Sequence, residues 1–422
     1  MKNPFRLFCL CLVLAAFVFL PGRAVSAQTG EEWSARVFGE TVTAKAGNQR
    51  SVSAWDAGLD LSEPPPGNYE ILPVGDIFIW RHPDNRSLFR AELSGVWDDV
   101  FWARRIGGLG PGSRGSFEGV LTFQNYTVPF EQSELVDGEE LKSESLLWGY
   151  VRPGIGIGYR RQVPPGGQSN MLAADLIFEP GFLFFARGSD TADNFLAPHD
   201  TFEFRTRLEL RWDALKRNLL RLPQKGYAAG ADIVYGYRAE WRNWGVNGAE
   251  PAGEGRNYAS FTGYFLAAGG LPWVKSKSQR LVGAIHAGSG FQLDRFSAER
   301  VGGGPDPLGE EYGSTYRPVL PGSVIREFFP EHYVIVTGEY RWQPFFFACL
   351  GADASAGWLD RLRRTGGGIV QKDNILPSLG VNITTGFFFK TRLKIAYNYN
   401  FSVVRNGGYG GHELLMEISG SL

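Results

Sequence analysis

The chain lacks the features that mark several protein classes. Its 422 residues include only three cysteines, and 43 lysines and arginines nearly balance 44 aspartates and glutamates. So few cysteines exclude a disulfide-stapled secreted domain, and the absence of surplus cations argues against a nucleic-acid partner. Beyond the first 27 residues the longest apolar run is about nine residues, where a membrane-spanning helix needs roughly 20. Glycine (55 residues) and aromatic side chains (14%) are abundant instead, and a hydrophobic content of 43% argues against disorder.

The first residues read as a secretory signal peptide. A positively charged start precedes the apolar run 7–20, and a small-residue stretch follows and ends at Ala27. This order predicts cleavage after Ala27. The alternative, a membrane anchor, needs a longer apolar run. Removal of residues 1–27 leaves Cys349 as the only cysteine, so no disulfide can form within the mature chain.

The mature chain alternates apolar and charged residues with a period of two, which is typical of strands that have one oily and one polar face. The segment 202–213 is the clearest case, since Phe202, Phe204 and Trp212 share one face while every residue of the other face is charged. Residues 333–342, 389–401 and 413–422 repeat the pattern.

Strand length separates two interpretations of this pattern, a soluble sandwich and a transmembrane barrel. The strands run to about 11–16 residues, whereas soluble strands usually have five or six, and a tilted strand that crosses an outer membrane needs about 9–11. Short connections such as 163–168 also alternate with predicted long loops at 129–145, 295–330, 359–375 and 402–409, as in transmembrane barrels. An arginine that faced lipid would cost roughly 2–4 kcal/mol, so the charged faces line the lumen.

The prediction is therefore an all-β, antiparallel transmembrane β-barrel that occupies residues 70–422 and includes the long plug-like loop 295–330. Fourteen strands are clear from residue 70 onward, and segments 33–42 and 51–61 of the N-terminal part 28–69 are candidates for two more. An even number places both chain ends on the periplasmic side. Sixteen strands are favoured, with fourteen as the alternative.

Four short motifs in residues 200–422 resemble, in order, the barrel of the BamA/TamA-type outer-membrane superfamily, the bacterial surface antigen family. They are a turn with Asp213, Pro223 and Gly226; the loop glycines Gly302 and Gly303; the segment 338–342 with Glu339 and Arg341; and the segment 350–357 with Asp353. The resemblance implies a sixteen-strand barrel with a role in outer-membrane assembly or transport.

The long loop carries the most specific part of this resemblance. The family has an aliphatic–Arg–Gly–aromatic tetrad here, whose arginine reaches into the lumen and pairs with acids on the next strands. The best match is 325–328, Ile325-Arg326-Glu327-Phe328, with Glu in place of Gly. The resemblance implies that Arg326 is a plug residue and that Glu339 and Asp353, beside Arg341, are its lumen partners. The alternative is a solvated loop arginine, because a non-glycine residue restricts the turn.

Two departures weaken an assembly role. BamA and TamA carry periplasmic POTRA domains, and residues 28–69 are too few for one. The last residue is Leu422, where outer-membrane signals usually end in an aromatic residue.

Enzymatic and metal-binding interpretations find little support in the sequence. None of the five histidines has a second ligand at metal-binding spacing, so no metal and no cofactor is expected. A lipid-hydrolysing barrel needs a serine beside a histidine on its lipid-facing rim; His332 is the only candidate by position, and no serine motif accompanies it. We therefore predict that the protein is not an enzyme.

Three functions remain open at this stage. The first is a barrel of the BamA/TamA type that acts in the assembly or transport of outer-membrane proteins or lipids, through a weak seam between first and last strands and a movable loop. The second is a passive porin-like channel, and the third is a lipid-modifying enzyme. The expected location is the outer membrane of a Gram-negative bacterium. The expected partners are outer-membrane lipid and either client outer-membrane proteins or a periplasmic partner, with no nucleic acid.

Overall fold

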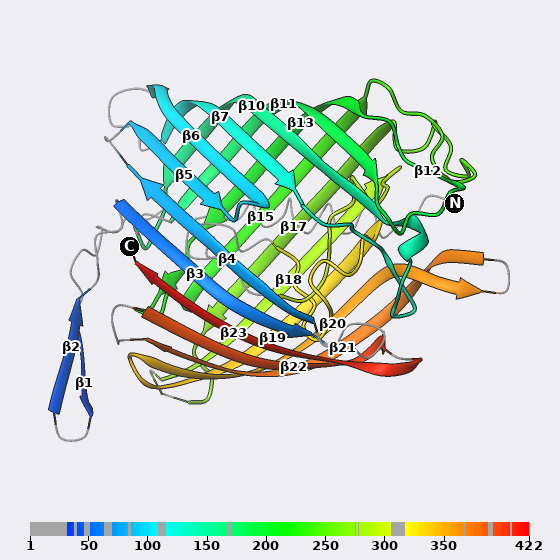
Figure 1. Cartoon of the computed structure of the whole chain (residues 1–422). Helices are drawn as coiled ribbons and strands as arrows, with labels where there is room; N and C mark the ends of the chain where they lie inside the picture. The colour runs from blue at the N-terminus through cyan, green and yellow to red at the C-terminus, as the bar shows by residue number, and fades with distance from the viewer. Residues whose placement is uncertain are drawn as a thin grey trace.

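The structure is a computed structural model of the whole chain (Figure 1). It describes residues 32–37, 40–45, 51–62, 70–82, 86–108, 115–166, 170–274, 276, 278–304, 317–365, 368–386, 391–405 and 407–421. The predicted signal peptide 1–27, its cleavage site at Ala27 and the terminal Leu422 lie outside these residues.

Sixteen long antiparallel strands close into a barrel, as the sequence predicted. In chain order they are β3 (Ser51–Ser62), β4 (Glu70–Arg81), β5 (Ser87–Leu93), β6 (Trp97–Gly108), β7 (Gly115–Thr127), β10 (Leu146–Gln162), β11 (Met171–Arg187), β13 (Thr201–Asp213), β15 (Pro223–Arg238), β17 (Asn257–Gly269), β18 (Gln279–Phe291), β19 (His332–Phe345), β20 (Ala348–Thr365), β21 (Gly368–Gly386), β22 (Thr391–Arg405) and β23 (Gly408–Ser421). Each strand pairs with the next, and β23 pairs with β3 to close the barrel.

The remaining elements are short. They are the hairpin β1 (Glu32–Val37) and β2 (Glu40–Lys45), the loop strands β8 (Leu135–Val136), β9 (Glu139–Glu140), β12 (Phe195–Leu196) and β16 (Gly245–Val246), the two-residue β14 (Lys216–Arg217) beside β15, and the 3₁₀ turn η1 (Lys142–Glu144). In the part of the chain that the structure describes, no helix has the length and apolar character to span a membrane.

The N-terminal strands differ from the prediction. Residues 51–62 form barrel strand β3, but residues 32–37 and 40–45 pair only with each other and form a separate hairpin, which Figure 1 shows apart from the barrel. The sixteenth strand comes instead from beyond residue 70, where fifteen strands are present rather than fourteen. Strand β5, with seven residues, is shorter than the 11–16 residues expected of a barrel strand.

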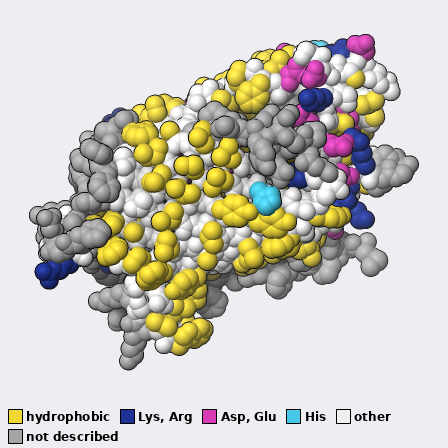
Figure 2. All heavy atoms as spheres, turned by 60° about the horizontal axis from the view of Figure 1, so that its bottom comes forward, with side chains coloured by type: hydrophobic (Ala, Val, Ile, Leu, Met, Phe, Trp, Pro, Cys, Tyr) yellow, Lys and Arg dark blue, Asp and Glu magenta, His cyan; other side chains and the backbone are white. Residues whose placement is uncertain are grey.

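The two faces of the wall are those that the alternation predicts. On β13, Phe202 is 61% exposed while Glu203 is fully buried inside, and the same alternation continues to Asp213. Apolar side chains cover the outer surface in Figure 2, whereas charged ones gather at the rim. The outside therefore suits lipid and the inside suits water and ion pairs.

The connections differ from the prediction on one side. Residues 359–375 and 402–409 were expected to be loops, but most of them extend the paired strands β20, β21, β22 and β23. Beyond the lipid layer an outward side chain no longer has to be apolar, so the alternation disappears although the backbone still pairs. The longest connection runs between β18 and β19, and its described residues, 292–304 and 317–331, form a loop that is called the plug loop below.

Candidate functional site

The plug loop folds back into the barrel, where Figure 1 shows it as a yellow chain within the ring of strands. The two motifs predicted in this loop, the glycines and the tetrad, come together, because isolated backbone bridges join Val301 to Phe328 and Gly303 to Ile325. The predicted site residues Gly302, Gly303, Ile325 and Phe328 thus form one compact unit, although more than twenty residues of sequence separate the glycines from the tetrad.

An apolar cluster packs this unit against the wall. Val301 and Leu320 of the loop are fully buried, and Phe328 is 6% exposed. They contact buried side chains of the C-terminal strands, namely Tyr333, Ile335, Leu359, Leu376 and Val403. Burial of a large aliphatic or aromatic side chain contributes about 1.5–3 kcal/mol, so the docked position of the loop is strongly favoured.

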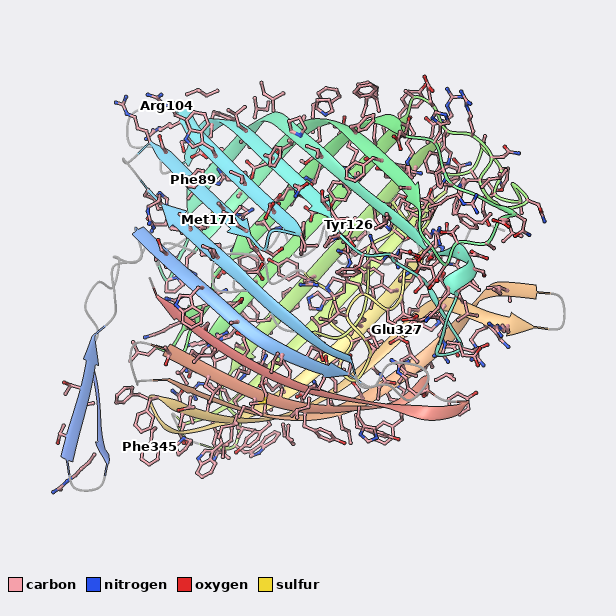
Figure 3. All side chains as sticks on the ribbon, viewed as in Figure 1. Phe89, Arg104, Tyr126, Met171, Glu327 and Phe345 are labelled. Carbon is pink, nitrogen blue, oxygen red and sulfur yellow. The ribbon has the colours of Figure 1, made fainter. Side chains whose placement is uncertain are left out.

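A buried ion pair locks the loop to β22. Glu327 accepts two hydrogen bonds from the Arg405 guanidinium, at 2.9 and 2.6 Å, and both side chains are about 3% exposed. Glu327 also accepts a hydrogen bond from the Val324 amide at 2.9 Å. Figure 3 labels Glu327 on the loop inside the barrel. The residue that departs from the family tetrad is therefore the one that anchors the loop.

A second carboxylate, Glu413 of β23, holds the loop backbone. It accepts hydrogen bonds from the amides of Gly304 (2.7 Å) and Gly322 (2.9 Å), and from the Asn398 side chain (2.7 Å). Glu413 is 1% exposed. The loop is thus fastened to the two last strands of the barrel, and β23 is the strand that closes it against β3.

Glycine is required where the loop meets Glu413. A Cβ atom on Gly303 would overlap the Ser323 carbonyl oxygen and the Glu413 carboxylate. By contrast, a Cβ on Gly338 of β19 would meet nothing within 4 Å.

We predict that Gly303→Ala destabilises the docked loop by about 1–3 kcal/mol, since overpacking a filled site forces neighbours to move. Limited trypsin digestion, with cleavage after Arg300 or Arg326 of the plug loop as the readout, measures this undocking. Gly338→Ala is the matched control and should digest like the unmodified protein. Equal resistance of both variants would show that the contact at Gly303 is unimportant.

Another part of the plug loop is tied to the connection between β7 and β10 and to strand β15. Arg300 forms a two-bond ion pair with Glu134, at 2.7 and 2.8 Å. Asp294 accepts hydrogen bonds from Arg238 of β15, the shorter at 2.5 Å. The loop therefore has anchors on both sides of the lumen.

The Glu134–Arg300 pair gives a pH dependence with a definite sign. Burial is the largest effect on the Glu134 carboxyl and alone would raise its pKa, but the Arg300 ion pair and the charges of Arg295 and Arg326 together hold that pKa below its ordinary 4.5. A lowered folded-state pKa means that the stabilisation is present above about 4.5 and is lost only as the pH falls through the lowered value.

We therefore predict that the loop contact persists from neutral pH down to about 4.5 and loosens below it. Fluorescence of the neighbouring tryptophan cluster, Trp148, Trp241 and Trp244, should show one acid transition. Glu134→Gln should remove it, and a transition that survives this substitution would assign it to another group.

The predicted pairing of Arg326 with Glu339 and Asp353 is not observed. The Arg326 guanidinium lies 4.6 Å from the centroid of the Tyr126 ring, on the opposite wall. Glu339 instead bonds Arg341 at 2.6 Å, and Asp353 faces Glu339 across the β19–β20 pair. Arg326 has a positive φ of 57°, and this left-handed turn directs its side chain away from the strands that Glu327 contacts.

The turn motif lies at the other end of the barrel. Asp213 accepts hydrogen bonds from the Leu215 amide (2.9 Å) and from Arg217 (2.7 Å). Gly226 has φ of 112°, and a Cβ there would strike the Ala214 carbonyl. Pro223, Glu339, Arg341 and Asp353 line one cavity with this turn's Arg217, so these predicted residues do share a site, without Arg326.

The wall opposite the anchors is a network of buried ion pairs centred on Glu203. This carboxylate is fully buried and bonds Arg152 at 2.8 Å, Arg238 at 3.3 Å and the Tyr258 hydroxyl at 2.8 Å. Further pairs link Arg207 with Glu179 and Glu209. The alternation along the strands predicts that these charged side chains face the lumen. It does not predict which of them pair, because pairing depends on the register between neighbouring strands.

Two cavities of the described lumen contain predicted site residues. The outer one, about 200 Å³, is lined by the plug-loop residues Arg295, Glu299, Arg317 and Arg326 together with Trp97 and Trp148. The second, about 190 Å³, contains the turn and the Glu339–Arg341 pair. No group of three or more metal-binding side chains is found in the described ranges.

A contact that sequence reasoning missed involves His332. Its Nδ1 lies 3.0 Å from the Ser289 hydroxyl, because the two residues are direct register partners on β18 and β19. Both fall on the outward parity of their strands, with Ile285 and Val336, which are 46% and 48% exposed. Knowledge of the register of these two strands would have revealed it.

These features define a sixteen-strand transmembrane barrel whose longest loop is anchored inside the lumen. Among solved structures, the barrel is similar to BamA from Haemophilus ducreyi lacking POTRA domains 1–3, with a TM-score of 0.50 and 11% identity over 94% of this chain and 75% of that one. CdiB from Acinetobacter baumannii matches with a TM-score of 0.45 and 10% identity over 92% of this chain and 65% of that one. CdiB from Escherichia coli gives 0.45 and 9%, over 93% and 67%.

The likeness to BamA confirms the predicted fold and, at 11% identity, the fold alone. No protein-family model and no curated protein matches the sequence.

Proposed function

We propose that the protein is an outer-membrane barrel of the Gram-negative envelope that assembles or transports outer-membrane proteins or lipids, and that it does so without catalysis. The observation that carries this proposal is the fastening of the plug loop to β22 and β23 through Arg405 and Glu413. Because β23 also forms the closing seam with β3, movement of the loop and opening of the seam are mechanically linked. Secretion would follow cleavage near Ala27, and the partners would be outer-membrane lipid and client proteins or a periplasmic partner.

The seam is short enough to open. It comprises nine register pairs, from Glu413↔Ser62 to Ser421↔Ala54, whereas β20 and β21 share eighteen. A seam with half the pairs requires fewer hydrogen bonds to break. Strands β4 and β5 share only five pairs, so pair number alone does not select the β23–β3 seam. The hydrogen bonds from the plug loop to Glu413 of β23 are what favour a lateral opening between β23 and β3.

A disulfide across the seam tests the proposal. Leu59 and Met416 are register partners and both face lipid, and paired strands place Cα atoms within disulfide range. We expect Leu59→Cys/Met416→Cys to fail to complement a deletion strain, scored by outer-membrane permeability and outer-membrane protein levels, and to recover on reduction. Phe265→Cys/Ile285→Cys, an equivalent lipid-facing pair between β17 and β18, is the control. Full complementation by the oxidised seam pair would reject lateral opening.

The porin alternative is less compatible with the lumen geometry. A passive channel requires a continuous water path, whereas the described plug loop crosses the lumen and is held by buried contacts on both sides. Charged side chains along the lumen wall are compatible with a porin and with a plugged barrel, but the docked loop favours the plugged barrel.

The Ser289–His332 contact supports lipid hydrolysis as a second candidate. The dyad lies on the outward face at the end of β18 and β19, where a lipid ester could reach it. A third group that orients the histidine is needed for an efficient base, and the nearest carboxylate, Glu331, is 4.0 Å from Nε2, too far for a hydrogen bond. The plugged-barrel function therefore ranks first. Release of fatty acid from phospholipid that disappears in both Ser289→Ala and His332→Ala would reverse this ranking.

A further inference from the structure

Three arginines of the outer cavity have no carboxylate partner in the described part of the chain. Arg317 lies 5.5 Å from the Trp97 ring, Arg326 lies 4.6 Å from the Tyr126 ring, and Arg295 contacts Trp244 at 5.2 Å. Arg295 is 5% exposed and donates one hydrogen bond, to the Glu144 carbonyl, while its Nε and Nη2 atoms are buried without an acceptor. Unpaired buried guanidinium groups are costly.

The arginines are also close enough to repel one another. Burial lowers the pKa of Arg317, and the adjacent Arg326 charge lowers it further. One carboxylate of the loop, Glu299, lines the same cavity. The whole lining of the cavity contains eight arginines and four carboxylates, which leaves a local excess of positive charge that a bound anion can neutralise.

The chemistry of the cluster selects the anion. Planar guanidinium groups match the oxygens of phosphate with paired hydrogen bonds, and a phosphate monoester carries about −1.5 to −2 charges near neutral pH. A cavity of about 200 Å³ holds a phosphorylated head group, since a water molecule in liquid takes about 30 Å³, but it is too small for a client strand. We propose that Arg295, Arg317 and Arg326 form a binding site for the phosphate monoester of a head group.

The wall beside this cavity indicates how a lipid would reach it. Strand β5 pairs only with residues 77–81 of β4, so residues 70–76 have a single hydrogen-bonded neighbour, β3, within the described chain. Figure 1 shows β4 continuing past the end of β5. The cavity lies behind this point, because Glu92 near the end of β5 and Trp97 at the start of β6 both line it. Leu59 and Ile77 flank the unpaired edge and are 41% and 45% exposed, so acyl chains can remain in the membrane while the head group enters.

The test is binding to the mature barrel in detergent micelles, followed by native mass spectrometry and quenching of tryptophan fluorescence. The probes are dioleoyl phosphatidic acid, dioleoylglycerol without the phosphate, and glycerol 3-phosphate without the chains. We expect phosphatidic acid to bind and dioleoylglycerol to fail. Tighter binding of phosphatidic acid than of glycerol 3-phosphate assigns a lipid source, and equal binding of the two assigns a soluble phosphate compound and rejects the membrane route.

Substitutions of single charged residues distinguish loss of the binding site from a general loss of structure. Arg317→Gln and Arg326→Gln should each weaken binding by about tenfold, the value of one charge-assisted hydrogen bond. Glu299→Gln should strengthen it, because it removes the opposing charge. Arg242→Gln, on a loop arginine whose side chain is 68% exposed, is the control and should bind as before. No binding of either phosphate probe, or equal binding by all variants, would overturn the proposal.

This inference goes beyond the proposed function and can fail separately from it. A barrel that binds no phosphate probe but loses complementation on seam oxidation overturns the head-group site alone. A barrel that binds phosphatidic acid but complements with the seam locked overturns lateral opening alone.

Discussion

Glu327→Ala should release the plug loop and turn a closed barrel into a conducting one. The substitution removes the buried carboxylate that pairs with Arg405, which is 4% exposed, and breaking one side of a buried ion pair costs about 3–5 kcal/mol. At about 1.4 kcal/mol for each factor of ten, the docking equilibrium shifts roughly 10²- to 10³-fold. Single-channel recording in planar bilayers should therefore show frequent large openings that the unmodified protein lacks.

Two further variants make this result specific. Glu331→Ala removes a carboxylate of the same loop whose side chain is 39% exposed, and it should stay closed. The double variant Glu327→Leu/Arg405→Met replaces the pair by apolar side chains of similar size, which is often neutral or stabilising in a protein interior. It should restore closure. A double variant as open as Glu327→Ala would mean that the pair acts through something other than loop docking.

Glu203→Ala should cause the largest loss of barrel stability. It leaves Arg152, which is 4% exposed, without its buried ion-pair partner, and it leaves the fully buried Arg238 with Asp294 as its remaining carboxylate partner. The expected loss in the free energy of unfolding is about 3–5 kcal/mol. The midpoint of urea unfolding in micelles, followed by the gel mobility of folded and unfolded barrel, measures it.

The same substitution should also weaken the docking of the plug loop, because Arg238 joins Glu203 of the wall to Asp294 of the loop. Glu240→Ala is the matched control: its side chain is 65% exposed and 4.0 Å from Arg242, so the expected change is below about 0.5 kcal/mol. If both variants unfold at the same urea concentration, the buried network does not hold the wall together.

The faces of the strands could be predicted from the sequence because a lipid-spanning strand must alternate. Phe202 and Glu203 fell on the sides that their chemistry demands. Where lipid no longer constrains the outward face, as in residues 359–375, the alternation ended and a paired hairpin was mistaken for a loop. The strand count of sixteen was right, but the described residues of segment 33–42 pair in a hairpin outside the barrel, and the chain beyond residue 70 supplies fifteen strands rather than fourteen.

The site was harder to predict because it depends on register and on loop conformation. The sequence resemblance singled out the segment 325–328, and the structure brings it against Gly302 and Gly303. It did not identify Glu327 as the anchor, since Arg405 lies about eighty residues away along the chain. The contact of Ser289 with His332 likewise follows from the pairing of β18 with β19, and no short motif encodes it.

The central claim is that the docked plug loop closes the barrel. The steady conductance of the unmodified mature protein in a planar bilayer tests it most directly. A barrel closed by Glu327, Arg405 and Glu413 should show little steady current and only rare openings. A large, stable, ohmic conductance in every inserted molecule would contradict the claim and identify the protein as an open pore.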